Sequence, residues 1–400
     1  MATNHEMTPS HEAPRINPVV VSILAVCMLW MTPNVVIALA TVMRMWDIYY
    51  SIHLVYFWNT LVMPLPLMAA ALLALRSEPA AAQQVQAFPS VAAYVSIPFL
   101  HRVLGWGLLV TGLVLISGRL WATQIEPRLI QIRHIEISSP AIREPLRILH
   151  ISDFQSEGIG AHERHAVRLM QACQPHLIIH TGDLLQIADP DQRQRELIHL
   201  EELFQPIAAQ VPMGIYTVQG DVDGPLLAEF RQGRGVMQLL ESRGVQLFAP
   251  DGSPVFLYGL TLGQSRFAQQ GAAVLEAWLH AVGQSHPGAF TIAAGHAPDY
   301  ILATDTLPID LCLAGHTHGG QVRIPFWGPL LWASAVPQNM ARGFHEVGST
   351  RINVSAGIGA EHIYGIPPIR FNCPPEMTLI TVIPEDTGVQ PVTRQESASL

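Results

Sequence analysis

Three long stretches within the first 120 residues of this chain carry almost no charge. Residues 16–43 contain no charged side chain, and at about 1.5 Å per residue a helix of that length exceeds the roughly 30 Å hydrocarbon core of a bilayer. The second stretch covers residues 51–75, and the third lies between Arg102 and Arg119. Because a helix satisfies its own backbone polar groups inside a bilayer, these stretches predict three transmembrane helices.

A cleaved signal peptide followed by buried core helices is the alternative interpretation. One signal sequence explains one such stretch, whereas this chain has three. Aromatic residues also flank the stretches, as they do at the interfaces of membrane proteins; they are Trp46, Tyr49, Tyr50, Trp106 and Trp121. These features favour a multi-pass membrane protein.

The basic residues give the orientation and exclude one class of partner. All 22 are arginine, and the chain has a net charge of −9. No basic run is present, which argues against a nucleic-acid partner. With the N-terminus outside, the cytoplasmic side carries Arg44, Arg119, Arg128 and Arg133, against Arg15, Arg76 and Arg102 opposite. This excess of one favours a cytoplasmic C-terminal domain. The four cysteines include no CxxC spacing that would suggest zinc. The three cysteines of the soluble part cannot all pair internally, which favours a reducing compartment.

Short apolar strands alternate with helical patterns from residue 146 onward, which predicts an α/β layered domain with a buried sheet. The expected strands are 147–152, 177–180, 214–218, 255–260, 290–294 and 310–314, and the expected helices are 161–174, 191–204, 225–240 and 270–282. Further strands between Gly- and Pro-rich loops close the domain. The expected organisation is therefore a tail (1–15), a transmembrane region (16–122), a linker with an edge strand (123–145), the folded domain (146–385) and a disordered tail (386–400).

Most of the expected strands in this domain end in a residue type that binds metal. Ligands of open α/β sheets collect at the carboxyl ends of the strands, so these side chains are expected to meet in one polar pocket. They are Asp153, Asp183, Asp221, His296, His316 and His318. Two cations held together by a shared carboxylate provide a nucleophile from water and neutralise the charge of a phosphoryl group. The pattern therefore indicates a two-metal hydrolase.

Several motifs resemble those of the calcineurin-like metallophosphoesterase family, and more narrowly its membrane-tethered bacterial branch. They are GDLLQ after an apolar strand, GHAPD, LAGHTHGGQVRIP and the closing VSAGIGAEH…IRFNCPPEMTLITV. The resemblance covers roughly residues 146–383. It implies a four-layer α/β/β/α sandwich, here preceded by an all-α transmembrane region, and a hydrolase acting on phosphoric ester bonds. It also implies residence in the bacterial inner membrane.

The resemblance also implies the role of each ligand. Asp153 and His318 would bind the first metal, Asp183 would bridge both, and Asp221, His296 and His316 would bind the second. Asp153, Asp183 and His296 would be the residues most directly involved in catalysis. The family pattern D-x-H has Gln155 in place of histidine, and G-D-x-x-[DN] ends in Gln186. The pattern G-N-H-[DE] reads Gly220-Asp221-Val222-Asp223.

These departures differ in their consequences. Gln155 offers a carbonyl oxygen as a metal ligand, or it is a polar loop residue lining the pocket, and the same alternative holds for Asp221. An oxygen-rich site favours Mn²⁺ or Mg²⁺ over Zn²⁺, with Mn²⁺ first and Fe as a further candidate. Val222 replaces a histidine thought to assist the leaving group, and a missing general acid typically costs on the order of 10² to 10⁴ in rate.

Three more residues are candidates for substrate contact. His162 and His165 begin a helix near the strand ends, where each is either solvated or within reach of a substrate phosphate. Arg323 follows the GHTHGGQ loop, where it contacts either phosphate or a surface partner. The aromatic Phe326, Trp327 and Trp332 pack in the core or, alternatively, dock on a lipid surface.

The sequence thus predicts a membrane-anchored phosphoesterase with two divalent metal ions. A phosphoester or pyrophosphate is the expected substrate, and the bilayer makes a lipid-linked one plausible, since relatives that cleave UDP-diacylglucosamine act on such a molecule. A metal-binding pseudoenzyme that acts as a membrane sensor or partner-binding module is the competing hypothesis, motivated by Val222 and Gln155. A transporter is less favoured, because transport pathways usually require charge within the membrane.

Overall fold

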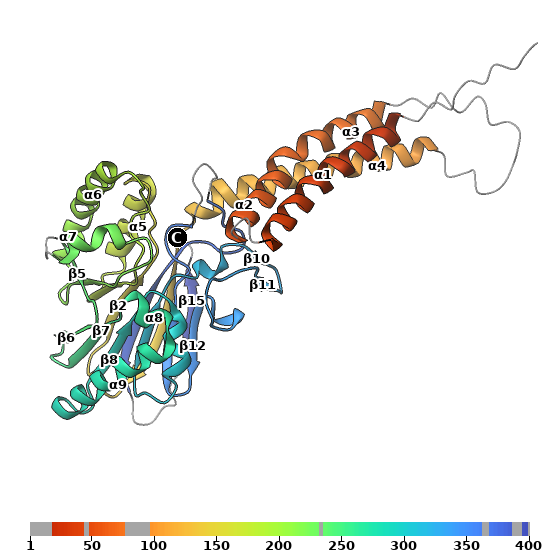
Figure 1. The fold of residues 1–400 in the computed structure, drawn as a ribbon. Helices are drawn as coiled ribbons and strands as arrows, with labels where there is room; N and C mark the ends of the chain where they lie inside the picture. Colours follow the sequence, from red (N-terminus) through yellow and green to blue (C-terminus); the bar gives the residue numbers. More distant parts are fainter. Residues whose placement is uncertain are drawn as a thin grey trace, which may run out of the picture. The chain divides into compact units, whose positions relative to one another are not determined.

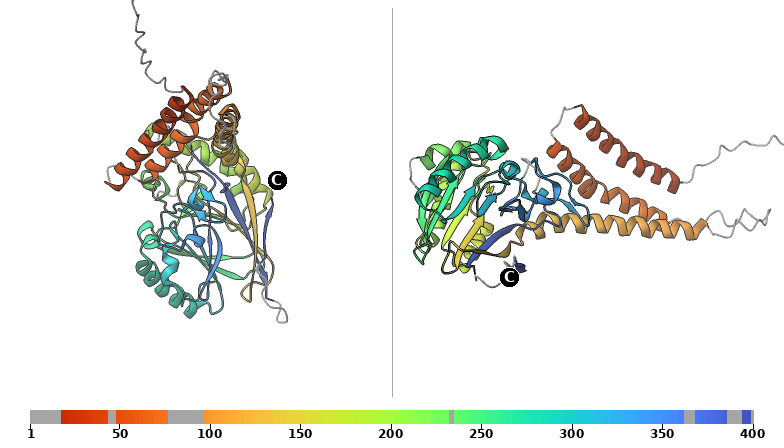
Figure 2. Two further views of the ribbon diagram at one scale, coloured as in Figure 1. Left: turned by 90° about the vertical axis from the view of Figure 1, so that its right-hand side faces the viewer. Right: turned by 90° about the horizontal axis from the view of Figure 1, so that it is seen from below.

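The computed structural model describes residues 18–43, 48–76, 97–231, 235–361, 368–385 and 394–398. It divides into two compact units, Met1–Trp121 and Ala122–Leu400. The ribbon of both units is shown in Figure 1, and two further views are given in Figure 2.

The first unit is built from apolar helices. They are α1 (Pro18–Val42), α2 (Ile48–Phe57), a π-helical turn (Trp58–Val62), α3 (Pro64–Arg76) and α4 (Ile97–Leu120). Three helical segments are long and apolar enough to cross a membrane, namely Leu24–Thr41, Leu54–Arg76 and Arg102–Arg128. The second is interrupted before Pro64, because proline has no N–H to continue the helical ladder. The third extends beyond the expected end at Arg119.

Small and polar residues hold these helices together. Asn59 donates from Nδ2 to Asn34 Oδ1 at 3.0 Å, and Thr41 donates to Ser51 Oγ at 2.6 Å. A Cβ added at Gly105 would collide with Leu75, so this glycine lets α3 and α4 approach closely. Interhelical hydrogen bonds and small residues are the usual means of helix association where lipid removes the hydrophobic driving force.

The second unit contains two large mixed sheets. The first has the order β15-β1-β14-β2-β3-β4-β5 and the second β12-β13-β9-β8-β7-β6. The strands of the first are β1 (Gln131–Ser139), β2 (Leu146–Ile151), β3 (Leu177–His180), β4 (Ile215–Thr217), β5 (Met237–Leu239), β14 (Glu376–Pro384) and β15 (Arg394–Ala398). Those of the second are β6 (Arg243–Phe248), β7 (Pro254–Gly259), β8 (Phe290–Ala294), β9 (Leu311–Ala314), β12 (Gly343–Val347) and β13 (Thr350–Val354).

Helices cover the outer faces of both sheets, which gives four layers (Figure 1). One buried cluster packs β2, β3 and β4 against α5 (Ala161–Ala172) and α6 (Pro190–Ala208). A second fills the space between the sheets, where Ile148 and Ile179 share a core with Leu257 and Ile292. A third joins the second sheet to α9 (Ala268–Ser285). The expected four-layer α/β/β/α sandwich is confirmed.

Several expectations for single segments are wrong. Residues 225–240 were expected to form one helix, but they contain a short helix α7 (Leu227–Arg231) and then β5, which adds to the edge of the first sheet. The apolar residues at the end of this segment form a strand, because the edge of β4 is available for pairing. The strand β1 is not an edge strand, since β15 pairs with it from within the tail expected to be disordered.

The segment expected to be a linker also belongs to the fold of the second unit. After α4 the chain continues as a π-helical turn (Trp121–Ile125) and a 3-10 turn (Glu126–Arg128). The carbonyl of Ala122 accepts from Arg370 N at 2.9 Å, and Glu126 accepts from Cys373 N through its side chain. β1 then pairs in parallel with β14 along nine residues. Residues 122–139 are therefore hydrogen-bonded into the domain.

Candidate metal centre

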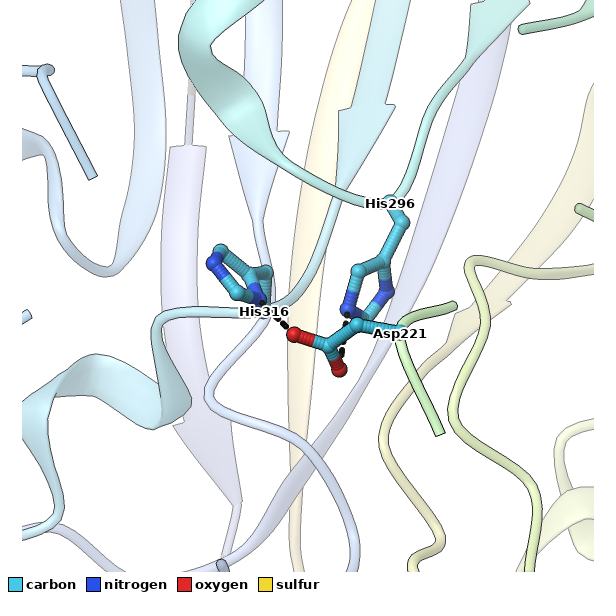
Figure 3. A group of neighbouring side chains, drawn as sticks. All are labelled: Asp221, His296 and His316. Atoms are coloured by element: carbon cyan, nitrogen blue, oxygen red, sulfur yellow. Dashed lines mark ion pairs between the residues drawn. The ribbon is translucent and has the colours of Figure 1, made fainter. Parts of the chain in front are cut away.

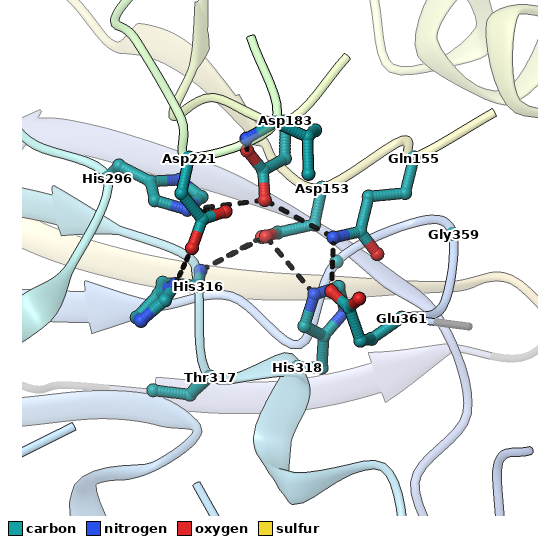
Figure 4. A network of polar contacts seen from close by, with 12 residues as sticks. Asp153, Gln155, Asp183, Asp221, His296, His316, Thr317, His318, Gly359 and Glu361 are labelled. Carbon is teal, nitrogen blue, oxygen red and sulfur yellow. Dashed lines mark hydrogen bonds and ion pairs between the residues drawn. The ribbon is translucent and has the colours of Figure 1, made fainter. Parts of the chain in front are cut away.

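Parallel pairing brings the acidic side chains to one end of the fold. β2, β3 and β4 run parallel and in register, so the residues that follow them lie side by side. β8 and β9 are likewise parallel in the second sheet. Figure 4 shows the resulting cluster, in which all the metal-binding types expected from the sequence meet; they are Asp153, Asp183, Asp221, His296, His316 and His318.

Four of these residues have an unusual backbone conformation. Asp153, Asp183, His316 and His318 have positive φ angles of 49°, 63°, 68° and 48°. Such angles are uncommon for residues with a Cβ, and they cluster at sites where the surrounding structure enforces them. Gly220 lies against Asp183, since a Cβ at that glycine would collide with the carboxylate. The strand-end loops are therefore packed to present side chains inward.

Asp221, His296 and His316 form the first group of possible ligands (Figure 3). One ligand atom from each lies within 4.8 Å of the others. His296 Nε2 is 3.6 Å from Asp221 Oδ1, and His316 Nδ1 is 3.5 Å from Asp221 Oδ2. We call this set the second metal position.

The orientation of both imidazoles fits metal binding. His296 Nδ1 donates to the carbonyl of Thr181 at 2.7 Å, which leaves Nε2 facing the carboxylates. That Nε2 is buried and has no hydrogen-bond partner among the described residues. His316 Nε2 lies 3.1 Å from the carbonyl of Ala333, which leaves Nδ1 facing Asp221. Metal-binding histidines typically donate their other nitrogen in this way.

Asp153, Asp183 and His296 form the other group within 4.8 Å. His318 lies beside it, with Nε2 3.5 Å from Asp153 Oδ1, although it belongs to neither group of three. We call Asp153, Asp183 and His318 the first metal position. Asp183 approaches both positions, because its Oδ2 is 3.4 Å from His296 Nε2. This placement agrees with a bridging role.

Burial makes this cluster costly without a cation. Burial and the neighbouring Asp183 charge raise the pKa of Asp153 to about 7, although the nearby His296 opposes the change. Burial also raises the pKa of Asp183. Burial lowers the pKa of His296, but the charges of Asp183 and Asp221 outweigh it and hold that pKa well above its usual value. Buried carboxylates that face one another are stabilised when divalent cations bind between them. The residues present therefore fit two metal ions.

Gln155 is placed beside the first metal position, but its amide nitrogen faces the carboxylates. Nε2 donates to Asp183 Oδ2 at 3.2 Å and to Glu361 Oε2 at 2.8 Å, while Oε1 is buried and finds no hydrogen-bond partner among the residues that the structure describes. Gln186 also donates to Glu361, at 3.2 Å. Glu361 lies in the closing VSAGIGAEH motif, but the sequence analysis did not single it out as a residue of the centre.

Two further residues near the second metal position have roles that the sequence did not predict. Asp223 is buried and accepts from the backbone N–H groups of Asp183, Leu184 and Gly220, each at 2.8 Å. It thereby joins the loops that carry Asp183 and Asp221. Arg266 pairs with Asp221 Oδ2 at 2.5 Å from α8 (Leu262–Arg266). Asp223 is the last residue of the motif compared with G-N-H-[DE], whereas no motif in the sequence marks Arg266.

The three residues expected to contact substrate have different surroundings. His162 lines a cavity of about 370 Å³ that also includes Gln155, and its Nε2 is 3.0 Å from the carbonyl of Ile358. His165 is half-buried on the same helix and is not among the residues lining that cavity. Arg323 donates to the carbonyl of Gly319 at 2.8 Å, so it holds the turn that carries His318.

The fold and the centre together define the class of this protein. Residues 146–320 match the family model of the calcineurin-like phosphoesterases. The second unit is therefore a calcineurin-like metallophosphoesterase domain, which belongs to a family with a dinuclear metal centre and makes the chain a hydrolase acting on phosphoester bonds.

The particular relatives are bacterial proteins. Uncharacterized metallophosphoesterase YkuE of Bacillus subtilis (strain 168) is 27% identical over 290 residues, which cover 69% of this chain and 94% of that protein. Uncharacterized metallophosphoesterase YkoQ of the same organism is 26% identical over 244 residues, or 59% of this chain and 83% of that protein. Phosphodiesterase YaeI of Escherichia coli (strain K12) is 34% identical over 92 residues, or 23% of this chain and 32% of that protein.

Proposed function

We propose that this chain is a membrane-anchored phosphoesterase that cleaves a phosphoester or pyrophosphate in a lipid-linked substrate. One observation carries the lipid-linked part. The cavity of about 370 Å³ has Thr123, Gln124, Pro127 and Arg128 on one side, and these residues end the third candidate membrane span. Its other side includes Phe154 and Gln155, which follow the first metal ligand. A substrate group occupying this cavity would touch both the end of the span and Gln155, whose amide lies 3.2 Å from Asp183 Oδ2.

The metal ions would be held by the residues at the two positions. Asp153 and His318 would hold the first, Asp221, His296 and His316 the second, and Asp183 both. Two divalent cations supply a nucleophile from water and offset the charge of a phosphoryl group. Mn²⁺ is the proposed ion, because the carboxylates of Asp153 and Asp183 outnumber the single imidazole at the first position.

An exposed apolar hairpin supports contact with a bilayer. β10 (Arg323–Ile324) and β11 (Gly328–Pro329) pair in antiparallel fashion, and the turn between them carries Phe326 and Trp327. Trp327 is 72% exposed and Phe326 is fully exposed. Exposed aromatic residues at this density are typical of surfaces that insert into the interface of a membrane. Trp332 differs, since its Nε1 donates to the carbonyl of Val336 at 2.8 Å.

The proposed location is the bacterial inner membrane, with the domain on the cytoplasmic side. The excess of arginine next to the candidate spans supports this orientation. Reporter fusions after residue 125 test it: a cytoplasmic reporter should be active there and an exported one silent. The opposite pattern would place the domain outside.

Turnover by the purified full chain tests the function. The chain in detergent with Mn²⁺ is offered bis(p-nitrophenyl) phosphate, and separately a lipid-linked nucleoside diphosphate in mixed micelles beside its water-soluble head group. We expect hydrolysis of the phosphodiester and a clear preference for the lipid-linked compound. Asp183→Asn is the control and should be inactive. Equal rates on the micellar and soluble compounds would contradict the lipid-linked substrate but not the phosphoesterase activity.

The absence of an imidazole at Val222 supports a second candidate, a metal-binding pseudoenzyme that serves as a membrane sensor or partner-binding module. The backbone N–H of Val222 donates to Asp183 Oδ1 at 3.0 Å, so the residue is at the centre, but its side chain cannot donate a proton. Mn²⁺ binding without turnover on any phosphoester would favour this candidate over the enzyme.

A further inference from the structure

One carboxylate beside the metal centre is held by two amides from different loops. Gln155 follows β2 and donates to Glu361 Oε2 at 2.8 Å, and Gln186 follows β3 and donates to Glu361 Oε1 at 3.2 Å. Figure 4 shows Glu361 facing Gln155 on the side of His318. Both oxygens of Glu361 are therefore engaged, which fixes its charge in place.

The two amide oxygens are not satisfied by this arrangement. Gln155 Oε1 and Gln186 Oε1 are both buried and have no hydrogen-bond partner among the described residues. Buried polar atoms in folded proteins are nearly always paired, so two such oxygens next to a carboxylate call for a specific reason. Amide and carboxylate oxygens are the donors that hard divalent cations prefer.

The link from Glu361 to the metal runs through Gln155. The same Nε2 that donates to Glu361 lies 3.2 Å from Oδ2 of Asp183, the carboxylate that approaches both metal positions. An amide can turn about its last bond, which exchanges its nitrogen and oxygen. Glu361 accepts from the nitrogen, so the strength of that hydrogen bond decides how firmly the amide is oriented at the first metal position.

We propose that Glu361 is a positioning residue for the first metal ion: held by Gln186, it orients the Gln155 amide and adds a negative charge where the chain has no imidazole. This inference rests on the proposed two-metal function. Charges and hydrogen bonds behind a ligand tune its affinity for metal, and their loss typically weakens binding by about 10- to 100-fold.

Mn²⁺ binding to Glu361→Gln tests the proposal without requiring turnover. This substitution removes the charge and keeps the shape. The full chain in detergent, freed of metal, is titrated with Mn²⁺ while free Mn²⁺ is followed by electron paramagnetic resonance. We expect the weaker of two Mn²⁺ affinities to fall by about tenfold or more. Glu157→Gln, which removes an exposed carboxylate of the same cavity, should leave that affinity within about twofold.

A second pair of variants separates positioning from a structural role. In a Gln155→Leu background no amide remains for Glu361 to orient, so Glu361→Gln should cost a smaller factor in Mn²⁺ affinity than it does in the parent. An equal loss in both backgrounds would mean that Glu361 does not act through the Gln155 amide, and it would overturn the proposal. Gln186→Leu should weaken Mn²⁺ binding in the same direction by a smaller factor. Thermal unfolding of each metal-free variant identifies misfolding, and the Gln186 variant keeps the test open if Glu361→Gln fails to fold.

The result can be told apart from failure of the proposed function. Unchanged Mn²⁺ affinity in Glu361→Gln overturns the role of Glu361 and leaves the phosphoesterase standing. If the parent chain binds Mn²⁺ but hydrolyses no phosphoester, the proposed phosphoesterase function is contradicted. The role of Glu361 in Mn²⁺ binding is not affected by that result.

Discussion

The two metal positions of this centre are built in different ways. The second has two imidazoles, His296 and His316, each oriented by a hydrogen bond to a backbone carbonyl. The first has one imidazole, His318, whose Nδ1 is buried with no hydrogen-bond partner in the described part of the chain, and the hydrogen bond between Gln155 and Glu361 lies beside it. The comparison sets a position with two oriented imidazoles against one whose surroundings are a network of amides and carboxylates.

The largest expected effect comes from the residue that both positions share. Asp183→Asn removes the bridging carboxylate, so we expect kcat to fall by more than about 10³-fold, since both metals contribute to the reaction. Hydrolysis of bis(p-nitrophenyl) phosphate with saturating Mn²⁺ measures it. Activity within tenfold of the parent would mean that the two positions do not share a ligand.

Restoring an imidazole next to the second position should raise the rate. Val222→His places a proton donor beside Asp183, and we expect kcat for a poor leaving group such as phenyl phosphate esters to rise by about 10- to 100-fold. The gain should shrink at alkaline pH as the imidazole loses its proton, which a pH–rate profile shows. Val222→Gln serves as the control, because an amide cannot supply that proton. An equal gain in this variant would refute the acid role.

The two positions should also fill in order. We expect the second to bind Mn²⁺ about tenfold more tightly, because its imidazoles are already oriented. His316→Ala should then abolish the tighter affinity and keep the weaker one, whereas His318→Ala should do the reverse. Calorimetric titration of the metal-free chain measures both. Loss of the same affinity in both variants would remove the distinction between the positions.

The smallest effect concerns the stability of the metal-free chain. The folded state keeps a proton on Asp153 up to a pKa of about 7, whereas an unfolded chain releases it near pH 4. Folding therefore loses stability as pH rises between these values. Asp153→Asn cannot ionise, so it does not lose this stability. In the presence of a chelator, the unfolding free energy of the variant relative to that of the parent should therefore increase by about 1 kcal/mol from pH 5 to pH 7.5. Thermal unfolding measures the difference, and a constant difference would show that Asp153 does not control it.

Local patterns in the sequence predicted an α/β layered domain with candidate ligands at its strand ends, whereas the four-layer sandwich and the role of each ligand were implied by the family resemblance. Asp153, Asp183 and His296 each follow an apolar strand, and parallel pairing brings such strand ends together. β5 could not be predicted, since its three residues form a strand only beside β4. Glu361 and Arg266 could not be predicted either, because their partners Gln155 and Asp221 are distant in the chain and only the tertiary fold brings them into contact.

The hydrogen bonds of residues 122–139 have a practical consequence. Ala122, Glu126 and β1 are all bonded to the closing segment that contains Arg370, Cys373 and β14. A protease that cut just before β2 would therefore remove a strand from the interior of the first sheet and expose the edge of β14. A fragment that keeps its metal centre should begin ahead of Ala122, so the apolar helices cannot be removed by a cut at residue 146, where the sequence predicts that the domain begins.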